Sequence, residues 1–218
     1  MEFDKLVHVR HSSRDFSDRP VSAATLTAIV MDAKQAPSWA NAQPWQVIIA
    51  TGQTLATIKQ QHRLRSRQGL PGNADLTVAH RTEWSDTARQ NMAIWNSELG
   101  QFLQQTVAGP AGYGRTQDNL FNAAALVYLV LPRPINQWAV FDLGAFAQTL
   151  MLSAANRGVQ SIPAYEIVRY PDNLRSLLQV DDDQRFVMGI ALGYENDNPI
   201  NKFGSSRASN QQFLTLKD

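Results

Sequence analysis

The sequence contains no cysteine among its 218 residues, and only 18% of them are charged. Without cysteine there can be no disulfide, no thiolate nucleophile and no sulfur-ligated metal. The formal net charge of +1 lacks the basic excess that nucleic acids or acidic membranes call for. The four histidines are scattered, without carboxylates at ligand spacing, and no G-x-S-x-G turn is present. We therefore expect neither a metal site nor a serine nucleophile.

Long apolar runs are also missing, although 44% of the residues are apolar. A membrane-spanning helix needs about 20 predominantly apolar residues, and no uninterrupted run approaches that length. The opening Met-Glu-Phe-Asp-Lys-Leu has neither the basic start nor the apolar core of a secretion signal. These absences predict a soluble cytoplasmic protein. The length and apolar content predict one domain over residues 1–218.

A polar loop between two prolines, Pro37-Ser-Trp-Ala-Asn-Ala-Gln-Pro44, separates a helical pattern from an apolar strand. The prolines fix φ and remove two backbone donors, so the segment cannot continue a helix. Ser38, Asn41 and Gln43 both donate and accept hydrogen bonds, while Trp39 presents a flat apolar face. This combination suits a planar heterocycle with polar edges. The alternative is an ordinary connection between a helix and a strand.

A compact basic segment, Arg10-His-Ser-Ser-Arg14, lies near the N-terminus. Its two guanidiniums and two hydroxyls can bind a phosphate, because arginine offers bidentate donors and serine adds a short neutral bond. The alternative is a solvated basic turn, since neither a glycine-rich nest nor a helix N-terminus follows.

Hydrophobic periodicity predicts the secondary structure. A short helix should lead into Arg10, and Ser22 should cap a second helix that Pro37 ends. Further helices are expected at 55–64, 75–105, 138–157 with Gly158 as the C′ residue, and 170–180. Strands are expected at 45–50, 123–131 and 186–193. This order of elements predicts an α+β sandwich in which helices dominate a small sheet.

Three regions carry weaker signals. Residues 64–73 read as an exposed connection, from which we select Gln68 as a ligand contact. The aromatic stripe of residues 75–105 is a core or subunit interface, or else places Trp84 or Trp95 against a flat substrate. Gly109-Pro-Ala-Gly-Tyr-Gly114 predicts a mobile loop that would act as a lid.

Together, Arg10-His-Ser-Ser-Arg-Asp-Phe16 and Asn41-Ala-Gln-Pro-Trp45 resemble the nitroreductase family of flavin proteins. That family carries an Arg-x-Ser-x-(Arg or Lys)-x-Phe segment near its start and an Asn-x-Gln-Pro-Trp loop later. The resemblance continues at 158–171 and 190–207. It implies a mostly antiparallel sheet surrounded by helices, a homodimer, and noncovalent FMN at the dimer interface.

The resemblance also implies roles for individual residues. Arg10, Ser12 and Arg207 would surround the phosphate of FMN, with His11 near the ribityl chain and Ser13 in the same segment. Arg14 would approach the N1 and O2 edge of the flavin ring, where a fixed cation stabilises the negative charge of reduction. The backbone at Pro163 and Ala164 would lie against N5. A partner subunit would supply Pro37, Ser38, Trp39 and Asn41.

The implied activity is transfer of a hydride from NADH or NADPH, through flavin N5, to nitroaromatic acceptors such as nitrobenzoates, or to quinones, by a ping-pong mechanism. No protein side chain is needed as a catalyst, and His11 and Glu166 are the only candidates for a general acid or base. The alternatives are an ene-reductase or flavin-processing enzyme of the same fold, and a flavin-binding module without turnover.

Overall fold

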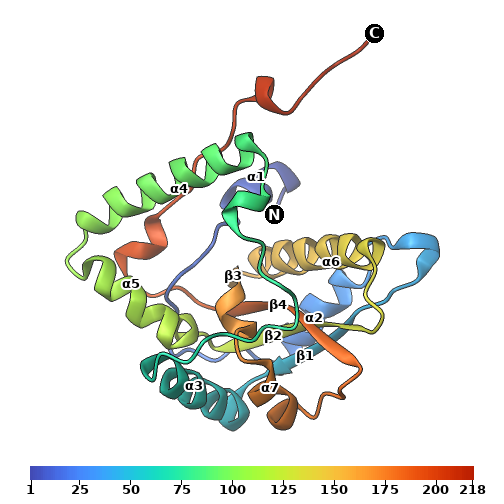
Figure 1. Ribbon diagram of the computed structural model, residues 1–218, viewed down its shortest axis with the longest axis vertical. Coiled ribbons are helices and arrows are strands. Elements are labelled where there is room, and N and C mark those ends of the chain that lie inside the picture. The colour runs from blue at the N-terminus through green and yellow to red at the C-terminus, as the bar shows by residue number, and fades with distance from the viewer.

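A four-stranded antiparallel sheet forms the middle layer of the molecule (Figure 1). In this computed structural model, which describes residues 1–218, the strands follow the order β1-β2-β4-β3. Central strand β2 is buried along nearly its whole length, which explains its unbroken apolar sequence. The strands are β1 (Gln46–Ala50), β2 (Ala125–Pro132), β3 (Gln160–Ala164) and β4 (Gln184–Gly193).

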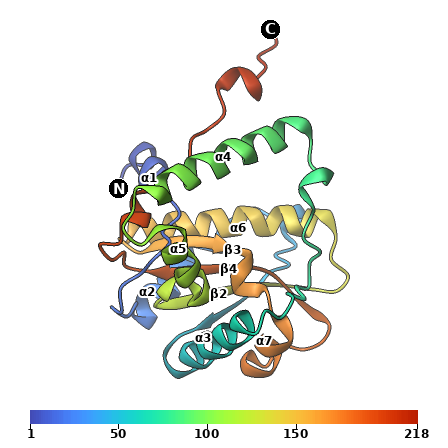
Figure 2. The ribbon, with the colours of Figure 1, turned by 60° about the vertical axis from the view of Figure 1, so that its left-hand side comes forward.

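Helices cover both faces of this sheet, as expected for an α+β sandwich. Alternate residues of β2 point to opposite sides, so Val127 and Leu129 join one core cluster while Leu126 and Tyr128 join the other. Figure 2 shows α6 on one side of the sheet and α3 and α7 on the other. The first layer contains α2 (Ala23–Ala33) and α6 (Gln137–Asn156), and the second α3 (Gly52–Arg67) and α7 (Pro171–Leu178).

By length and composition alone, α6 is the one helix that could cross a membrane. In this fold it is a core helix instead. Leu143, Phe146 and Leu150 are almost completely buried against α2 and the sheet. Burial on the sheet-facing side accounts for the apolar composition without any membrane.

The remaining elements lie outside the sandwich and shape its edge. The side chains of α4 pack against Ile200 and Phe203 of the C-terminal segment, and α5 contacts α4. The last residues project away from the body of the molecule (Figure 1). These helices are α1 (Phe3–Val9), α4 (Asp86–Gln104) and α5 (Gly109–Asp118). Short 3-10 turns occur at Trp39–Asn41, Arg81–Glu83, Leu120–Asn122, Tyr165–Val168, Pro199–Lys202 and Asn210–Gln212.

Local capping signals in the sequence are confirmed. The Ser22 hydroxyl accepts a hydrogen bond from the Thr25 amide at 3.1 Å, which starts α2. Gly158 has a φ of 73° just after α6, where a left-handed residue ends a helix. Strand β3, which the periodicity did not predict, forms because Gln160–Ala164 pairs with β4 along its length.

Two predictions for the middle of the chain are wrong. The helix expected from residue 75 begins only at Asp86, because Asp75 is held by Arg175 at 2.6 Å and by the Phe186 amide at 2.8 Å. The segment Gly109–Gly114 is not a mobile lid but the first part of α5. Its proline stands at the start of the helix, where no backbone donor is needed, and packing against α4 sustains the helix through its glycines.

Candidate functional site

The basic segment runs along the outer edge of strand β3. Helix α1 ends at Val9, and the chain then extends so that Ser12 bridges Ser161 and the Ser13 amide donates to the Ser161 carbonyl at 3.1 Å. Because β3 is an edge strand, its free side is available for this contact. The sheet thus positions the basic segment beside Pro163 and Ala164, two and three residues further along β3.

A polar pocket of about 270 Å³ is lined in part by this basic segment. It brings Arg207 of the C-terminal segment next to residues that lie almost two hundred positions earlier in the chain. Five of the predicted cofactor-binding residues therefore share one pocket. Its lining comprises Val7, His8, Arg10, His11, Ser12, Arg14, Phe203, Gly204, Ser205 and Arg207.

The pocket concentrates positive charge without a matching carboxylate on its wall. None of Arg10, Arg14 and Arg207 forms an ion pair. Burial and the neighbouring Arg207 charge lower the pKa of Arg10, which shows that the positive form is penalised there. An anion bound in this pocket would relieve the repulsion.

Arg14 is the most constrained of the three arginines. One of its terminal nitrogens donates to the Ser12 carbonyl at 2.8 Å, and the guanidinium lies 5.0 Å from the centre of the Phe203 ring. The side chain is only 5% exposed, burial lowers its pKa, and its Nε has no hydrogen-bond partner. A buried donor left unpaired is costly, and Arg14 lines the pocket, which makes it a candidate for contact with a ligand there.

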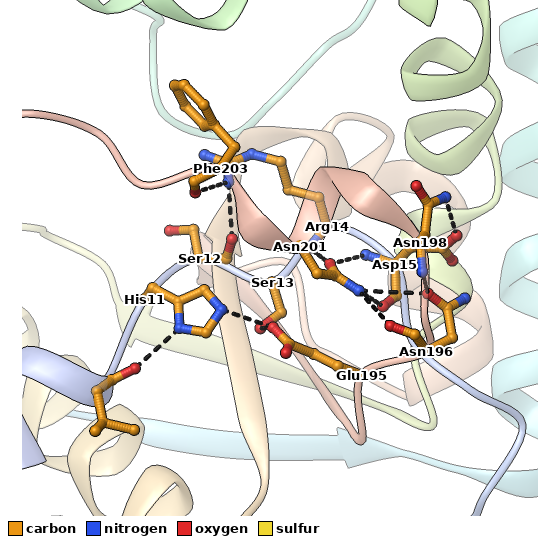
Figure 3. A network of polar contacts seen from close by, with 11 residues as sticks. His11, Ser12, Ser13, Arg14, Asp15, Glu195, Asn196, Asn198, Asn201 and Phe203 are labelled. Atoms are coloured by element: carbon orange, nitrogen blue, oxygen red, sulfur yellow. Dashed lines mark hydrogen bonds and ion pairs between the residues drawn. The ribbon is translucent and has the colours of Figure 1, made fainter. Parts of the chain in front are cut away.

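A network of asparagines fixes the backbone around Arg14 (Figure 3). The Asn201 side-chain oxygen accepts from the amides of Arg14 and Asp15 at 2.8 and 3.0 Å. Its nitrogen donates to the Asp15 carbonyl at 2.7 Å. The Asp15 carboxylate accepts from Asn122 and Asn198, both at 2.7 Å. The network joins the basic segment to the C-terminal segment that carries Phe203 and Arg207.

His11 and Ser13 are connected by a carboxylate that the sequence analysis did not select. His11 Nε2 lies 2.7 Å from Glu195 Oε1, and the Ser13 hydroxyl donates to the same oxygen at 2.5 Å (Figure 3). Ser13 is fully buried and lies outside the pocket lining, unlike its neighbour Ser12. Glu195 lies two residues after β4, and its antiparallel bridge with Phe16 brings it to the basic segment.

The polar loop after α2 has a shaped backbone, as predicted. Ala40, Asn41 and Gln43 have φ values of 45°, 61° and 44°, a left-handed conformation that is unusual for residues other than glycine. The Gln43 amide donates to the Ser38 hydroxyl at 3.0 Å. Trp39 is 60% exposed, and its ring lies 4.7 Å from that of Trp138.

This loop and the N-terminus are attached at different points along α6. The Trp39 amide donates to Asp142 in the first half of that helix, whereas the N-terminal ammonium, at the start of α1, donates to Asn156 at its end. At about 1.5 Å per residue, these two anchor points are about 20 Å apart along the helix. None of Pro37, Ser38, Trp39 and Asn41 lines the pocket that contains Arg10 and Arg207.

The sequence matches the family model described as the nitroreductase family over residues 7–194, most of the chain. The chain belongs to the nitroreductase family. It is 27% identical to the 4-nitrobenzoate reductase of Pseudomonas putida, with 97% of this chain and 94% of the relative covered. It is also 27% identical to the chloronitrobenzene nitroreductase of Comamonas testosteroni, covering 98% and 96%.

Solved structures share this nitroreductase fold. The crystal structure of FMN-dependent nitroreductase NfnB from Mycobacterium smegmatis in complex with NADPH has a TM-score of 0.90 to this chain at 24% identity. The alignment covers 99% of this chain and 97% of that one. The predicted antiparallel sheet surrounded by helices is thereby confirmed as the fold of the family.

Besides Ser13 and the four residues of the polar loop, three more predicted site residues of this nitroreductase-family chain lie outside the basic pocket. Pro163 and Ala164 are half-buried on β3, opposite Ile190 and Gly189 of β4. Gln68 is exposed at the C-terminal cap of α3, on the other face of the sheet from α6. The roles predicted for these residues in cofactor binding stay predictions.

Glu166, one of the two candidates for a general acid or base, is engaged by other side chains. It accepts from Arg169 at 3.0 Å and lies 3.1 Å from His62 Nε2. Burial alone would raise the pKa of Glu166, but His62 and Arg169 outweigh it and lower the pKa. The carboxylate therefore remains ionised in a paired environment.

Proposed function

We propose that this chain is an FMN-dependent oxidoreductase that uses NADH or NADPH to reduce nitroaromatic compounds such as nitrobenzoates, with quinones as further acceptors, in ping-pong fashion. The observation that carries the proposal is the buried, unpartnered Nε of Arg14 in a pocket with two more unpaired arginines. Such a pocket requires an anionic ligand with acceptor atoms, and FMN has both. The names of the relatives supply the activity and the cofactor.

The proposed roles of single residues follow from which of them line the pocket. Arg10, Ser12 and Arg207 hold the phosphate, because guanidiniums and a hydroxyl provide its preferred donors. Arg14, held between Ser12 and Phe203, faces the N1 and O2 edge of the ring and stabilises negative charge there. The bound flavin supplies the hydride chemistry between the nicotinamide and the acceptor.

We also propose that the active protein is a homodimer in which each site is completed by a second copy of the chain. The polar loop and the N-terminus are anchored at points about 20 Å apart along α6, which favours a loop and a basic pocket that serve different ligand sites within one chain. Large apolar side chains beside the loop are exposed, with Trp138 at 57% and Phe141 at 71%. Such a patch favours burial against another subunit. In this assignment Pro37, Ser38, Trp39 and Asn41 come from the second copy.

The proposal further concerns the flavin ring, the ligand contact of Gln68, the absence of a general acid or base, and the cellular location of the protein. The backbone at Pro163 and Ala164 lies against N5, because β3 carries it past the edge where the basic segment is bound. Gln68 contacts a ligand, and no side chain acts as a general acid or base. The proposed location is the cytoplasm.

The test begins with the colour of the purified protein and the mass of the chromophore it releases. We expect FMN and a yellow protein whose flavin absorbance is bleached by NADH or NADPH without oxygen, then restored by 4-nitrobenzoate. Product analysis with 4-nitrobenzoate, a quinone and an enone distinguishes a nitroreductase from an ene-reductase. A yellow protein that neither nucleotide bleaches would indicate a flavin-binding module. A colourless protein that does not bind added FMN would refute the proposal.

A further inference from the structure

The hydrogen bonds of His11 select one protonation state of its ring. Nδ1 lies 2.9 Å from the Val9 carbonyl, an atom that can only accept, so Nδ1 carries a hydrogen. Nε2 lies 2.7 Å from Glu195 Oε1, which already accepts from the Ser13 hydroxyl at 2.5 Å. Both ring nitrogens thus face acceptors, and only the imidazolium form satisfies both contacts.

The groups around His11 shift its pKa in opposite directions. The hydrogen bond with Glu195 raises the pKa of His11, with a smaller contribution from the Val9 carbonyl, whereas burial and Arg10 lower it, and the net direction is upward. Burial alone would raise the pKa of Glu195, but His11 and Ser13 outweigh it and the net direction is downward. The other titratable groups of the same pocket are His8, Arg14 and Arg207. Glu195 is therefore the carboxylate that holds a fourth positive charge beside the three arginines.

Glu195 contacts His11 from outside the pocket. His11 lines the pocket together with Arg10 and Arg207, but Glu195 does not. Its carboxylate faces His11 and Ser13 on the far side of the basic segment (Figure 3). It can thus orient the imidazole without neutralising the arginines that face the ligand.

We propose that Glu195 is a positioning residue that keeps His11 as a cation directed at the phosphate-bearing chain of FMN, so that cofactor retention depends on pH through His11. This inference rests on the proposed function, since it assumes that the pocket holds FMN. As the pH rises above the pKa of His11, the ring loses its proton and the pocket loses one positive charge. FMN should therefore bind more weakly at alkaline pH. Without the Glu195 carboxylate, the same loss should occur at lower pH.

The experiment is equilibrium dialysis of the FMN-loaded protein over a pH series, comparing wild type, Glu195→Gln, His11→Asn and the double variant. For wild type we expect the dissociation constant of FMN to rise on the order of tenfold between about pH 6.5 and pH 9, the loss of one charge-assisted contact. In Glu195→Gln the rise should move to lower pH. In His11→Asn the profile should be flat over this range, and Glu195→Gln should add little to it.

A second readout follows the imidazole directly. NMR titration, with the His11 signal assigned by its absence in His11→Asn, should give a lower His11 pKa in Glu195→Gln than in wild type. Asp172→Asn is the matched control. It removes the carboxylate of an ion pair between α7 and Arg65 of α3, neither of which lines the pocket, and should leave both FMN retention and the His11 titration unchanged.

The inference is overturned if Glu195→Gln keeps the wild-type pH profile, or if His11→Asn still shows the alkaline loss. Should Glu195→Gln fail to fold, as judged by circular dichroism, the comparison of wild type with His11→Asn still decides whether His11 sets the pH dependence. A wild-type protein that binds no FMN at any pH would refute the proposed function itself, which is a different outcome.

Discussion

At the scale of single residues, the pocket is defined by arginines that lack carboxylate partners. Arg14 Nε is buried without a partner, and neither Arg10 nor Arg207 meets a carboxylate. Arg207 donates only to Ser205 and Ser206 of its own segment. These guanidiniums suit a ligand phosphate because no internal carboxylate competes for them.

Replacing Arg207 tests the phosphate assignment. We expect Arg207→Ala to leave the fold intact, because the side chain is exposed, and to weaken FMN binding by about tenfold or more. FMN remaining after dialysis is measured by absorbance. Arg65→Ala is the control: it removes a guanidinium of α3 that pairs with Asp172 of α7, and the variant should keep its FMN. Unchanged occupancy in Arg207→Ala would argue against its role at the phosphate.

Lys59 gives an independent prediction away from the pocket. It lines a cleft of about 530 Å³ and donates to the Ala123 carbonyl at 2.6 Å, and burial together with Arg63 lowers its pKa to about 8. Near pH 8 about half of the Lys59 side chains should be neutral amines, whereas an ordinary lysine is almost entirely protonated. We expect an acetylating reagent at that pH to label Lys59 before Lys5, Lys34, Lys202 and Lys217, measured by peptide mass spectrometry.

A charge change beside Lys59 provides its control. Arg63→Gln removes the neighbouring positive charge, so the pKa of Lys59 should rise and its labelling at pH 8 should slow. Equal labelling of all five lysines in the folded wild-type protein would contradict the prediction.

At the scale of elements, the site is assembled by strand pairing and by the asparagine network. Strand β3 binds the basic segment along its free edge, and β4 ends where Glu195 can reach it. Asn201 then ties the C-terminal segment to the backbone of Arg14 and Asp15. Three parts of the chain that are distant in sequence are held together by backbone and amide hydrogen bonds.

Asn201 is the element-scale test. Asn201→Ala leaves the amides of Arg14 and Asp15 buried without an acceptor, so we expect a loss of about 2 kcal/mol or more in the free energy of unfolding. Urea denaturation measures it. Asn210→Ala, in an exposed turn near the C-terminus, should change the free energy of unfolding by less than about 0.5 kcal/mol. Equal stability of the two variants would show that the network does not hold the site together.

At the scale of the whole molecule, α6 holds both regions that lead to the segments resembling the family. The polar loop is attached near its start, and the N-terminal region that leads to the basic pocket is attached at its end. A second copy of the chain is the simplest source of a loop for each pocket, and the exposed Trp39, Trp138 and Phe141 offer it an apolar surface.

A charge placed on this surface tests the dimer. We expect Phe141→Glu to produce monomers in analytical ultracentrifugation and to lose FMN, although the basic pocket is unchanged, because the second copy no longer contributes its loop. Leu64→Glu replaces a similarly exposed apolar residue on α3 and should remain a dimer with its FMN. A Phe141→Glu monomer that retains FMN as tightly as wild type would contradict the shared site.

Patterns local in sequence predicted most of the elements. The apolar period identified α2, α6 and three strands, and Ser22 and Gly158 marked helix ends through their own side chain and backbone. The failures at Asp75 and Gly109 have a common cause, since a distant ion pair holds one segment out of helix and packing against α4 sustains the other as helix.

The sequence by itself determined the family and the basic and amide-bearing segments, because their residue types and spacing are written in consecutive positions. Only the tertiary structure decided that Arg207 shares a pocket with Arg10 and that Glu195 contacts His11. It also decided that the loop at Trp39 is attached to the first half of α6. Such contacts depend on which strands pair and which edge stays free. Those choices follow from burial summed over the whole chain, so no short segment reveals them.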